Sequence, residues 1–181
     1  MKLKIKLSVE KTSYIFLVLI FLAAFSIRFY GMMDVLMQED GASYLTRAIY
    51  TKADPKWIWK MYMSDPYWII TGNTGQVYLM SFFMNFFQTP EFAGKMVSVL
   101  FGSLTIVVVF FIAKELHGVK AGLFAAGLIA FSPINVFYSK LMYADVLLGF
   151  FISLTVLFFI KAIKYKEVPK KVTEVKQETN L

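Results

Sequence analysis

Two neighbouring carboxylates, Glu39 and Asp40, follow the first long apolar segment of the chain, and Asp145 stands between the last two such segments. A carboxylate beside hydrocarbon is costly unless it is paired, solvated or bound to a metal. If Asp40 and Asp145 lie on the same side of a membrane, they favour one shared polar site, with ordinary solvated loop charges as the alternative. Asp40 and Asp145 are also the candidate ligands for a divalent cation.

Three basic residues accompany these acids along the chain: Arg28, Arg47 and Lys140. Arg28, near the end of the first apolar segment, has two interpretations. Its side chain either extends to the membrane interface, or it is a cation that faces Asp40 or a lipid phosphate. On a helix, the spacing of Asp40, Tyr44 and Arg47 would place all three on one face.

The composition indicates that most of the chain lies in a lipid bilayer. Of 181 residues, 58% are hydrophobic, 18% aromatic and 17% charged, whereas a soluble domain has about 25% charged residues. The apolar residues fall in long runs, as membrane-spanning segments do. The absence of cysteine excludes disulfides and thiolate metal sites. The net charge of +7 comes without a basic stripe interleaved with aromatic residues, which argues against nucleic-acid binding.

Four apolar segments are long enough to cross a bilayer: 14–30, 96–113, 121–137 and 146–160. Lysines precede the first and follow the last, which predicts a multi-pass protein of the cell membrane with both termini in the cytoplasm. The shorter apolar segment 77–87 would make the number of crossings odd. We therefore predict that it forms an interfacial or re-entrant helix.

The segment 32–93 is predicted to be one long outer loop. It contains all three tryptophans together with many charged residues, a mixture typical of helices that lie in the headgroup region. Pro133 should kink or end the third span. Gly122 and Ala126, with Ala130 one turn later, have the spacing of small residues that allows close helix packing.

These patterns predict an all-α, polytopic membrane protein with four transmembrane helices and interfacial helices in the first outer loop. A membrane-embedded module would comprise 1–165, followed by a disordered cytoplasmic tail at 166–181 that is rich in lysine and glutamate. The segment 14–30 has a cleaved secretory signal as its alternative, but the later spans favour a signal anchor.

Several short motifs follow one another in a set order. They are an arginine in the first span, Asp40-x-x-x-Tyr44-x-x-x-Ala48, Lys-Glu-Leu-His-Gly at 114–118, Ala-Gly-Leu-Phe-Ala-Ala at 121–126, Ser132-Pro133, and Tyr138-Ser139-Lys140 followed by Asp145. As an ordered set over roughly 14–165, they resemble the dolichyl-phosphate-mannose protein mannosyltransferase superfamily of GT-C glycosyltransferases. They are also similar to the lipid A aminoarabinose transferases and, more distantly, to the catalytic subunit of oligosaccharyltransferase.

The resemblance implies that a sugar passes from a polyprenyl-phosphate donor to a protein, glycan or lipid acceptor at the extracytoplasmic membrane face. Asp40 matches the catalytic position and would be the general base for an acceptor hydroxyl, with inversion at the anomeric carbon. Asp145 matches a second acidic position, near the donor phosphate or a metal. Substrate contacts are further expected from Glu39, Tyr44, Arg28, Arg47, Tyr138 and Lys140.

Because the resemblance concerns the N-terminal portion of such enzymes, the chain could be a fragment or half of a split enzyme completed by a partner chain. The alternative from another class is a non-catalytic integral membrane subunit or assembly partner that keeps the scaffold. A small transporter subunit is a third option, disfavoured because no span carries a charge at its midplane. The sequence leaves the sugar, the acceptor and the metal open.

Overall fold

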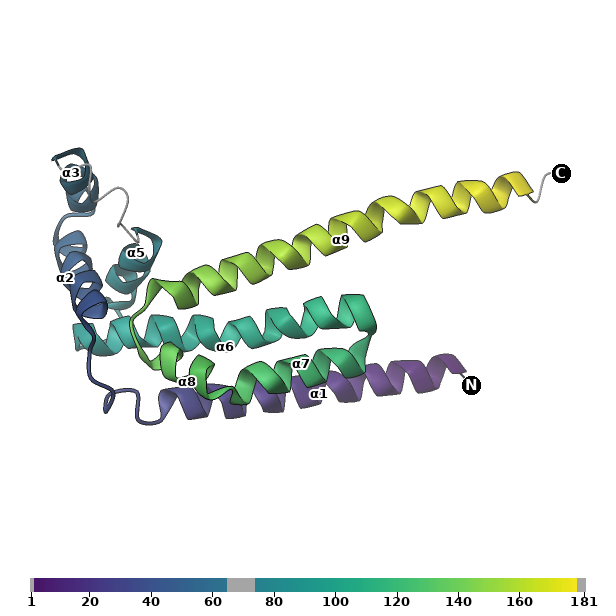
Figure 1. Cartoon of the computed structure of the whole chain (residues 1–181), viewed down its shortest axis with the longest axis horizontal. Helices are drawn as coiled ribbons and strands as arrows, with labels where there is room; N and C mark the ends of the chain where they lie inside the picture. Colours follow the sequence, from purple (N-terminus) through teal and green to yellow (C-terminus); the bar gives the residue numbers. More distant parts are fainter. Residues whose placement is uncertain (1, 65–73, 179–181) are drawn as a thin grey trace.

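The computed structural model describes residues 2–64 and 74–178, with side chains described for 11–64 and 74–165. All regular elements in these ranges are α-helices, in agreement with the predicted all-α class. The helices, labelled as in Figure 1, are α1 (Lys2–Phe29), α2 (Glu39–Ala53), α3 (Trp57–Ser64), α5 (Thr74–Phe83), α6 (Pro90–His117), α7 (Val119–Phe131), α8 (Pro133–Lys140) and α9 (Ala144–Glu178).

Three helices of the described chain are long and apolar enough to cross a membrane: Lys11–Phe29 within α1, Pro90–His117, and Ala144–Tyr165 within α9. A fourth crossing results if α7 and α8 count as one span, since they are joined end to end with a bend of 56°. The structure therefore agrees with a polytopic membrane protein of the predicted kind.

The bend between α7 and α8 lies where the sequence predicted it. Pro133 is the first residue of α8 and has no backbone N–H with which to continue α7. Between the predicted spans 121–137 and 146–160, the chain stays helical as far as Lys140, which leaves only 141–143 between α8 and α9. Proline is favourable in the first turn of a helix, so Pro133 both prevents α7 from continuing and begins α8.

The long helices run alongside one another, with α2, α3 and α5 gathered at one end and both chain termini at the other (Figure 1). This arrangement is the one expected for an even number of crossings. At 10 residues, α5 is about 15 Å long, half the thickness of the hydrocarbon core. It is not among the candidate spans of the described chain.

Helix α6 is the centre of the bundle and packs against α1, α5, α7, α8 and α9. A Cβ placed on Gly122 would lie 2.8 Å from the backbone oxygen of Phe110, so α7 approaches α6 as closely as glycine allows. This confirms the packing expected from the small residues of α7. The core between α1, α6 and α7 consists of Leu17, Ala24, Ile106, Phe110, Ala126 and Ala130.

A second core joins the short helices to the N-terminal end of α6. Its buried members come from α2, α3, α5, the turn after α5, α6 and the link between α8 and α9: Leu45, Ala48, Ile58, Tyr62, Val77, Met80, Met84, Ala93, Val97 and Met142. Burial of this many apolar side chains fixes the positions of the short helices relative to the bundle.

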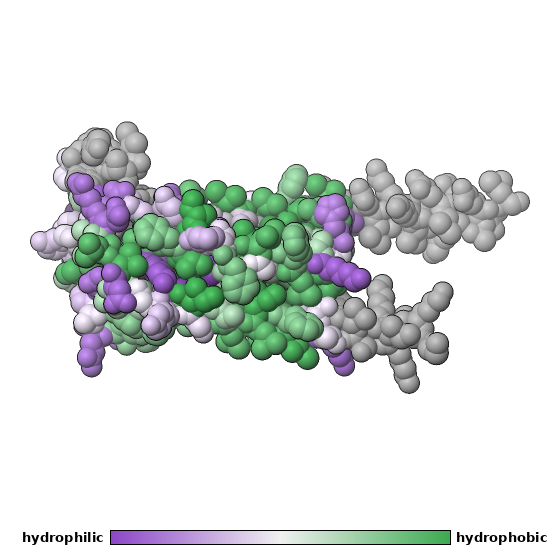
Figure 2. All heavy atoms as spheres, turned by 60° about the horizontal axis from the view of Figure 1, so that its bottom comes forward, coloured by the Kyte–Doolittle hydropathy of each residue, from purple (hydrophilic) through white to green (hydrophobic). Residues whose placement is uncertain are grey.

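Hydrophobic residues form a broad band around the middle of the face seen in Figure 2, and hydrophilic residues gather at its two ends. On α9, the outward side chains Leu148, Phe151, Ile152 and Phe158 are exposed. An exposed apolar band between polar ends is typical of a surface solvated by lipid. The side chains of 166–178 are not described, so the disordered tail predicted at 166–181 stays a prediction.

Candidate functional site

Asp40 lies in the first turn of α2, which begins at Glu39, and both side chains are exposed. Carboxylates in the first turn of a helix are stabilised by the partial positive charge of the unpaired N–H groups there. The next residue, Gly41, is buried. The helix therefore holds Asp40 at the boundary between the packed outer layer and the solvent.

Asp145 occupies the equivalent place on α9, in the first turn, and is also exposed. The link 141–143 that leads into α9 is anchored by Leu141 and Met142, both of which are buried. Because the link is buried against the bundle, the exposed carboxylate of Asp145 lies on the surface of the bundle.

The structure brings these two acidic turns into contact. The Tyr143 hydroxyl donates a hydrogen bond of 3.3 Å to Oε1 of Gln38. A Cβ on Gly41 would lie 3.4 Å from the Cβ of Met142, in ordinary van der Waals contact. The residues just before and after Asp40 thus contact the residues just before Asp145. Residues 38–41 and 142–145 are called the paired acidic turns below.

The side chain of Arg28 does not extend to the surface of the bundle, which the first of its two interpretations requires. Its side chain is fully buried, and its guanidinium donates hydrogen bonds to the backbone oxygens of Ala24, Ala130 and Ile129 at 3.0–3.1 Å. A fourth, of 3.3 Å, goes from Nε to the Ser139 hydroxyl. Arg28 therefore connects α1 with α7 and α8 inside the bundle.

The break at Pro133 explains this position of Arg28. Without an N–H on Pro133, the carbonyl of Ile129 loses its helical partner, and the end of α7 also leaves the carbonyl of Ala130 without one. Carbonyls left unpaired at membrane depth need another donor. A cation at the C-terminal end of α7 meets this need and is favourable to the helix dipole.

Arg47 is also buried, with only 7% of its surface exposed. It donates a hydrogen bond of 3.0 Å to the Ser43 hydroxyl and lies 5.8 Å from the centre of the Tyr44 ring. Tyr44 itself is half-buried, whereas Asp40 is exposed. Of the three residues expected on one helix face, Arg47 and Tyr44 are in contact and Asp40 stands further out.

The remaining predicted residues, Tyr138 and Lys140, lie on α8 close to the paired acidic turns. The ring centroids of Tyr138 and Tyr143 are 5.8 Å apart. The ammonium of Lys140 donates a hydrogen bond of 2.8 Å to the Tyr30 carbonyl at the end of α1. Lys140 thereby holds the turn after α1 next to the outer end of α8.

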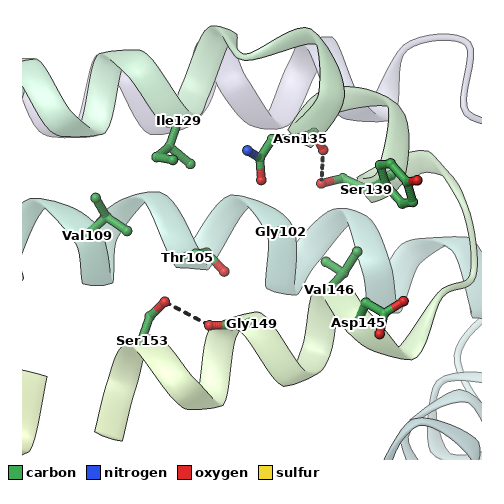
Figure 3. Close-up of a pocket in the computed structure, with 11 residues that line it drawn as sticks. Gly102, Thr105, Val109, Ile129, Asn135, Ser139, Asp145, Val146, Gly149 and Ser153 are labelled. Atoms are coloured by element: carbon green, nitrogen blue, oxygen red, sulfur yellow. Dashed lines mark hydrogen bonds between the residues drawn. The ribbon is translucent and has the colours of Figure 1, made fainter. Parts of the chain in front are cut away.

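A cavity of about 200 Å³ opens between α6, α8 and α9. Figure 3 shows Asn135 and Ser139 of α8 on one side, Gly102 and Thr105 of α6 as the floor, and Asp145 and Ser153 of α9 opposite. A second, more open hollow of about 350 Å³ shares Asn135, Tyr138, Asp145 and Val146 with it. We call the two together the α8–α9 cavity.

Most of the polar residues of this cavity are not among the site residues predicted from the sequence. Asn135, Thr105 and Ser153 are isolated polar residues within apolar segments, a pattern that marks functional positions in membrane helices. Lys95 was not predicted either; it is buried and pairs with Glu91 at 2.7 Å while donating to the Val35 carbonyl. The spacing of four between Glu91 and Lys95 was the available signal.

Metal binding by Asp40 and Asp145 stays a prediction. Within the described ranges, no three side chains of His, Cys, Asp or Glu come together as a metal site. A divalent cation held there would need further oxygen ligands from water or substrate, as Mg²⁺ sites commonly have.

The bundle of apolar helices defines a multi-pass integral membrane protein. The chain belongs to the dolichyl-phosphate-mannose-protein mannosyltransferase family, whose sequence model matches residues 75–172, more than half of the chain. No curated protein and no solved structure matches the chain. The matched range includes Asp145, Tyr138 and Lys140 but not Asp40, which lies before it.

Proposed function

We propose that this chain is a membrane glycosyltransferase, or the N-terminal part of one, that uses a polyprenyl-phosphate sugar as its donor, with Asp40 as the general base. The acceptor is a hydroxyl group presented at the extracytoplasmic membrane face. The observation that carries the proposal is the contact between the paired acidic turns, because it places an acid from outside the family match beside the matched segment.

In the proposed reaction, the Asp40 carboxylate takes the proton of the acceptor hydroxyl as its oxygen attacks the anomeric carbon. The bond from that carbon to the phosphate oxygen breaks at the same time, the phosphate leaves with the electron pair, and the configuration inverts. A positioned base of this kind contributes about 10²–10⁴-fold to the rate. Exposure of Asp40 at the first turn of α2 leaves it open to an acceptor.

The leaving phosphate requires positive charge. Lys140, half-buried beside the paired acidic turns, is the proposed source, since Arg28 is engaged by four hydrogen bonds inside the bundle. Arg47 and Tyr44 are proposed to shape the acceptor side of the site from α2. Glu39, exposed beside Asp40, is proposed to orient the acceptor.

The test compares Asp40→Asn with Asp34→Asn in membranes of a strain that lacks the chain and has each variant restored. Asp34 is an exposed acid in the turn after α1 and has no proposed role. Transfer of labelled sugar from the polyprenyl-phosphate donor should fall about 100-fold or more with Asp40→Asn and stay near wild type with Asp34→Asn. Transfer that survives Asp40→Asn, or does not depend on the chain, would overturn the proposal.

The second candidate is a non-catalytic subunit. The apolar outer face of α9, which packs mainly against α6, favours it, because a partner chain could cover that face. The same experiment separates the two functions. Transfer that requires the chain but is unchanged by Asp40→Asn is the result expected of a subunit.

A further inference from the structure

The hydrogen-bonding groups that line the α8–α9 cavity indicate which part of a sugar donor it can bind, the sugar or the phosphate. A phosphate needs hydrogen-bond donors in the walls of its site, whereas a sugar hydroxyl can donate to acceptors. The two ligands therefore require different groups in the described side chains that line the cavity.

Two hydroxyls of the cavity wall direct their own protons away from it. Thr105 donates to the Phe101 carbonyl at 2.8 Å, and Ser153 donates to the Gly149 carbonyl at 2.7 Å. Such back-bonding along a helix leaves the hydroxyl oxygen with lone pairs for another donor. Towards the cavity, Thr105 and Ser153 therefore present acceptors.

Asp145 and Asn135 reinforce this character. The ionised carboxylate of Asp145 is an acceptor only, and it lies at the mouth where the inner and outer hollows meet. The amide nitrogen of Asn135 donates to the Ser132 hydroxyl at 3.4 Å, which leaves its carbonyl oxygen as an acceptor. In Figure 3, the Asn135 side chain points from α8 towards α6.

Positive charge is missing from the same walls. Among the described residues that line the two hollows, none is lysine or arginine. The guanidinium of Arg28 contacts Ser139 from behind and is used by backbone carbonyls. A phosphate, whose oxygens accept hydrogen bonds and carry negative charge, would meet mostly acceptors and a carboxylate here, with only the neutral donors of Tyr138 and Asn135.

The size of the cavity limits the ligand to a single small group. The inner hollow of about 200 Å³ lies below the roughly 300–1,000 Å³ of pockets that enclose whole ligands. The outer hollow continues from it to the surface, past the exposed ring of Tyr138. An aromatic face at such an entrance suits the C–H face of a sugar ring.

We propose that the α8–α9 cavity binds the sugar ring of the donor, through hydroxyls that donate to Asp145, Asn135, Thr105 and Ser153, while the phosphate stays outside it. This inference rests on the proposed function for the identity of the donor. It assigns Asp145 to sugar recognition, in place of the phosphate or metal role that the resemblance implied.

Gly149 and Gly127 provide a matched pair for the test. A Cβ on either glycine would meet nothing within 4 Å, so both positions accept a side chain without a backbone clash. Gly149 lines the α8–α9 cavity, whereas Gly127 lines a separate apolar groove on α7. Leucine at Gly149 fills the cavity, and leucine at Gly127 makes the same change elsewhere.

The experiment measures the affinity of the full chain in lipid nanodiscs for two probes, a short-chain polyprenyl-phosphate hexose and the same polyprenyl phosphate without the sugar. Wild type should bind the sugar-bearing probe at least about tenfold more tightly. Gly149→Leu should abolish this preference, and Gly127→Leu should retain it. Thr105→Val keeps the side-chain volume but removes an acceptor, so it should reduce the preference several-fold. This variant still tests the inference if Gly149→Leu fails to fold.

Equal affinity of wild type for the two probes, or no binding of either, would overturn the inference. So would a preference that survives both Gly149→Leu and Thr105→Val. Asp40→Asn should keep the preference because Asp40 is assigned to the acceptor. Failure of Asp40 as the base therefore leaves this measurement unaffected, and the two proposals can fail separately.

Discussion

Arg28 and Ser139, 111 residues apart in the sequence, are joined by a buried hydrogen bond of 3.3 Å. The bond links α1 to the helix that carries Asn135 and Tyr138, so the first span sets the position of one wall of the α8–α9 cavity. The other hydrogen bonds of Arg28 satisfy the carbonyls that the break at Pro133 leaves unpaired. Arg28 therefore both stabilises the broken end of α7 and positions the α8 wall of the cavity.

Replacement of Arg28 should destabilise the bundle. Arg28→Met keeps much of the side-chain volume but leaves several buried acceptors without a donor, so we expect a loss of about 2–4 kcal/mol in unfolding free energy. Arg28→Lys should be intermediate, because an ammonium cannot reproduce the planar fork. Unfolding by SDS titration in mixed micelles measures the change.

Ser139→Ala is the matched control for Arg28, since it removes only one of these hydrogen bonds and should cost about 0.5–1.5 kcal/mol. A loss as large as that of Arg28→Met would show that Ser139, and not the carbonyls of α7, accounts for the effect.

Gly122 and Gly127 should respond to alanine in opposite directions, although both lie on α7. The new Cβ at Gly122 would stand 2.8 Å from the Phe110 carbonyl oxygen, so α7 has to move away from α6. We expect Gly122→Ala to cost about 1–3 kcal/mol. Gly127→Ala meets open space and should gain about 0.5–1 kcal/mol from the lower flexibility of alanine. Equal effects in the SDS titration would contradict the close approach of the two helices.

Gln76 should be more stable as leucine. Only 2% of the residue is exposed, and neither atom of its buried amide has a hydrogen-bond partner among the residues that the structure describes. Removal of such a group should raise the unfolding free energy by about 1–3 kcal/mol. Gln88→Leu, at an exposed position, should change it by less than about 0.5 kcal/mol. A destabilised Gln76→Leu would mean that the amide is bonded after all.

Asp54 should titrate below its usual range. A hydrogen bond from Lys60 is the main cause that lowers its pKa, and the backbone N–H of Lys56 adds to it. Because the folded-state pKa is the lower one, the contribution of Asp54 to stability is present above the unfolded pKa and is lost as the pH falls through the folded one. The effect is small because the pair is exposed.

The measurement for Asp54 is its carboxyl chemical shift against pH by NMR. Lys60→Met should raise the pKa towards the ordinary value, whereas Lys56→Met should change it less because the backbone N–H remains. An unchanged pKa in Lys60→Met would rule out the hydrogen bond as the main cause.

The agreement between sequence and structure is best where the cause is local. The apolar segments gave the candidate spans because a hydrocarbon layer requires about 20 apolar residues in a row. Pro133 predicted the bend because the absence of its N–H interrupts the helix in which it lies. Gly122 predicted the close packing because the absence of a side chain lets another helix approach at that position. The lysines at both ends of the chain favoured an even number of crossings, which left the short segment 77–87 out of the spans.

The tertiary structure alone decided how distant residues meet. The arginine of the first span could have faced the interface or the site, and its burial depended on carbonyls freed about 100 residues later in the sequence. The contact between the paired acidic turns and the acceptor-lined cavity likewise join segments that no local pattern relates. Periodicity and composition constrain each helix separately, whereas the site arises from the packing of helices against one another.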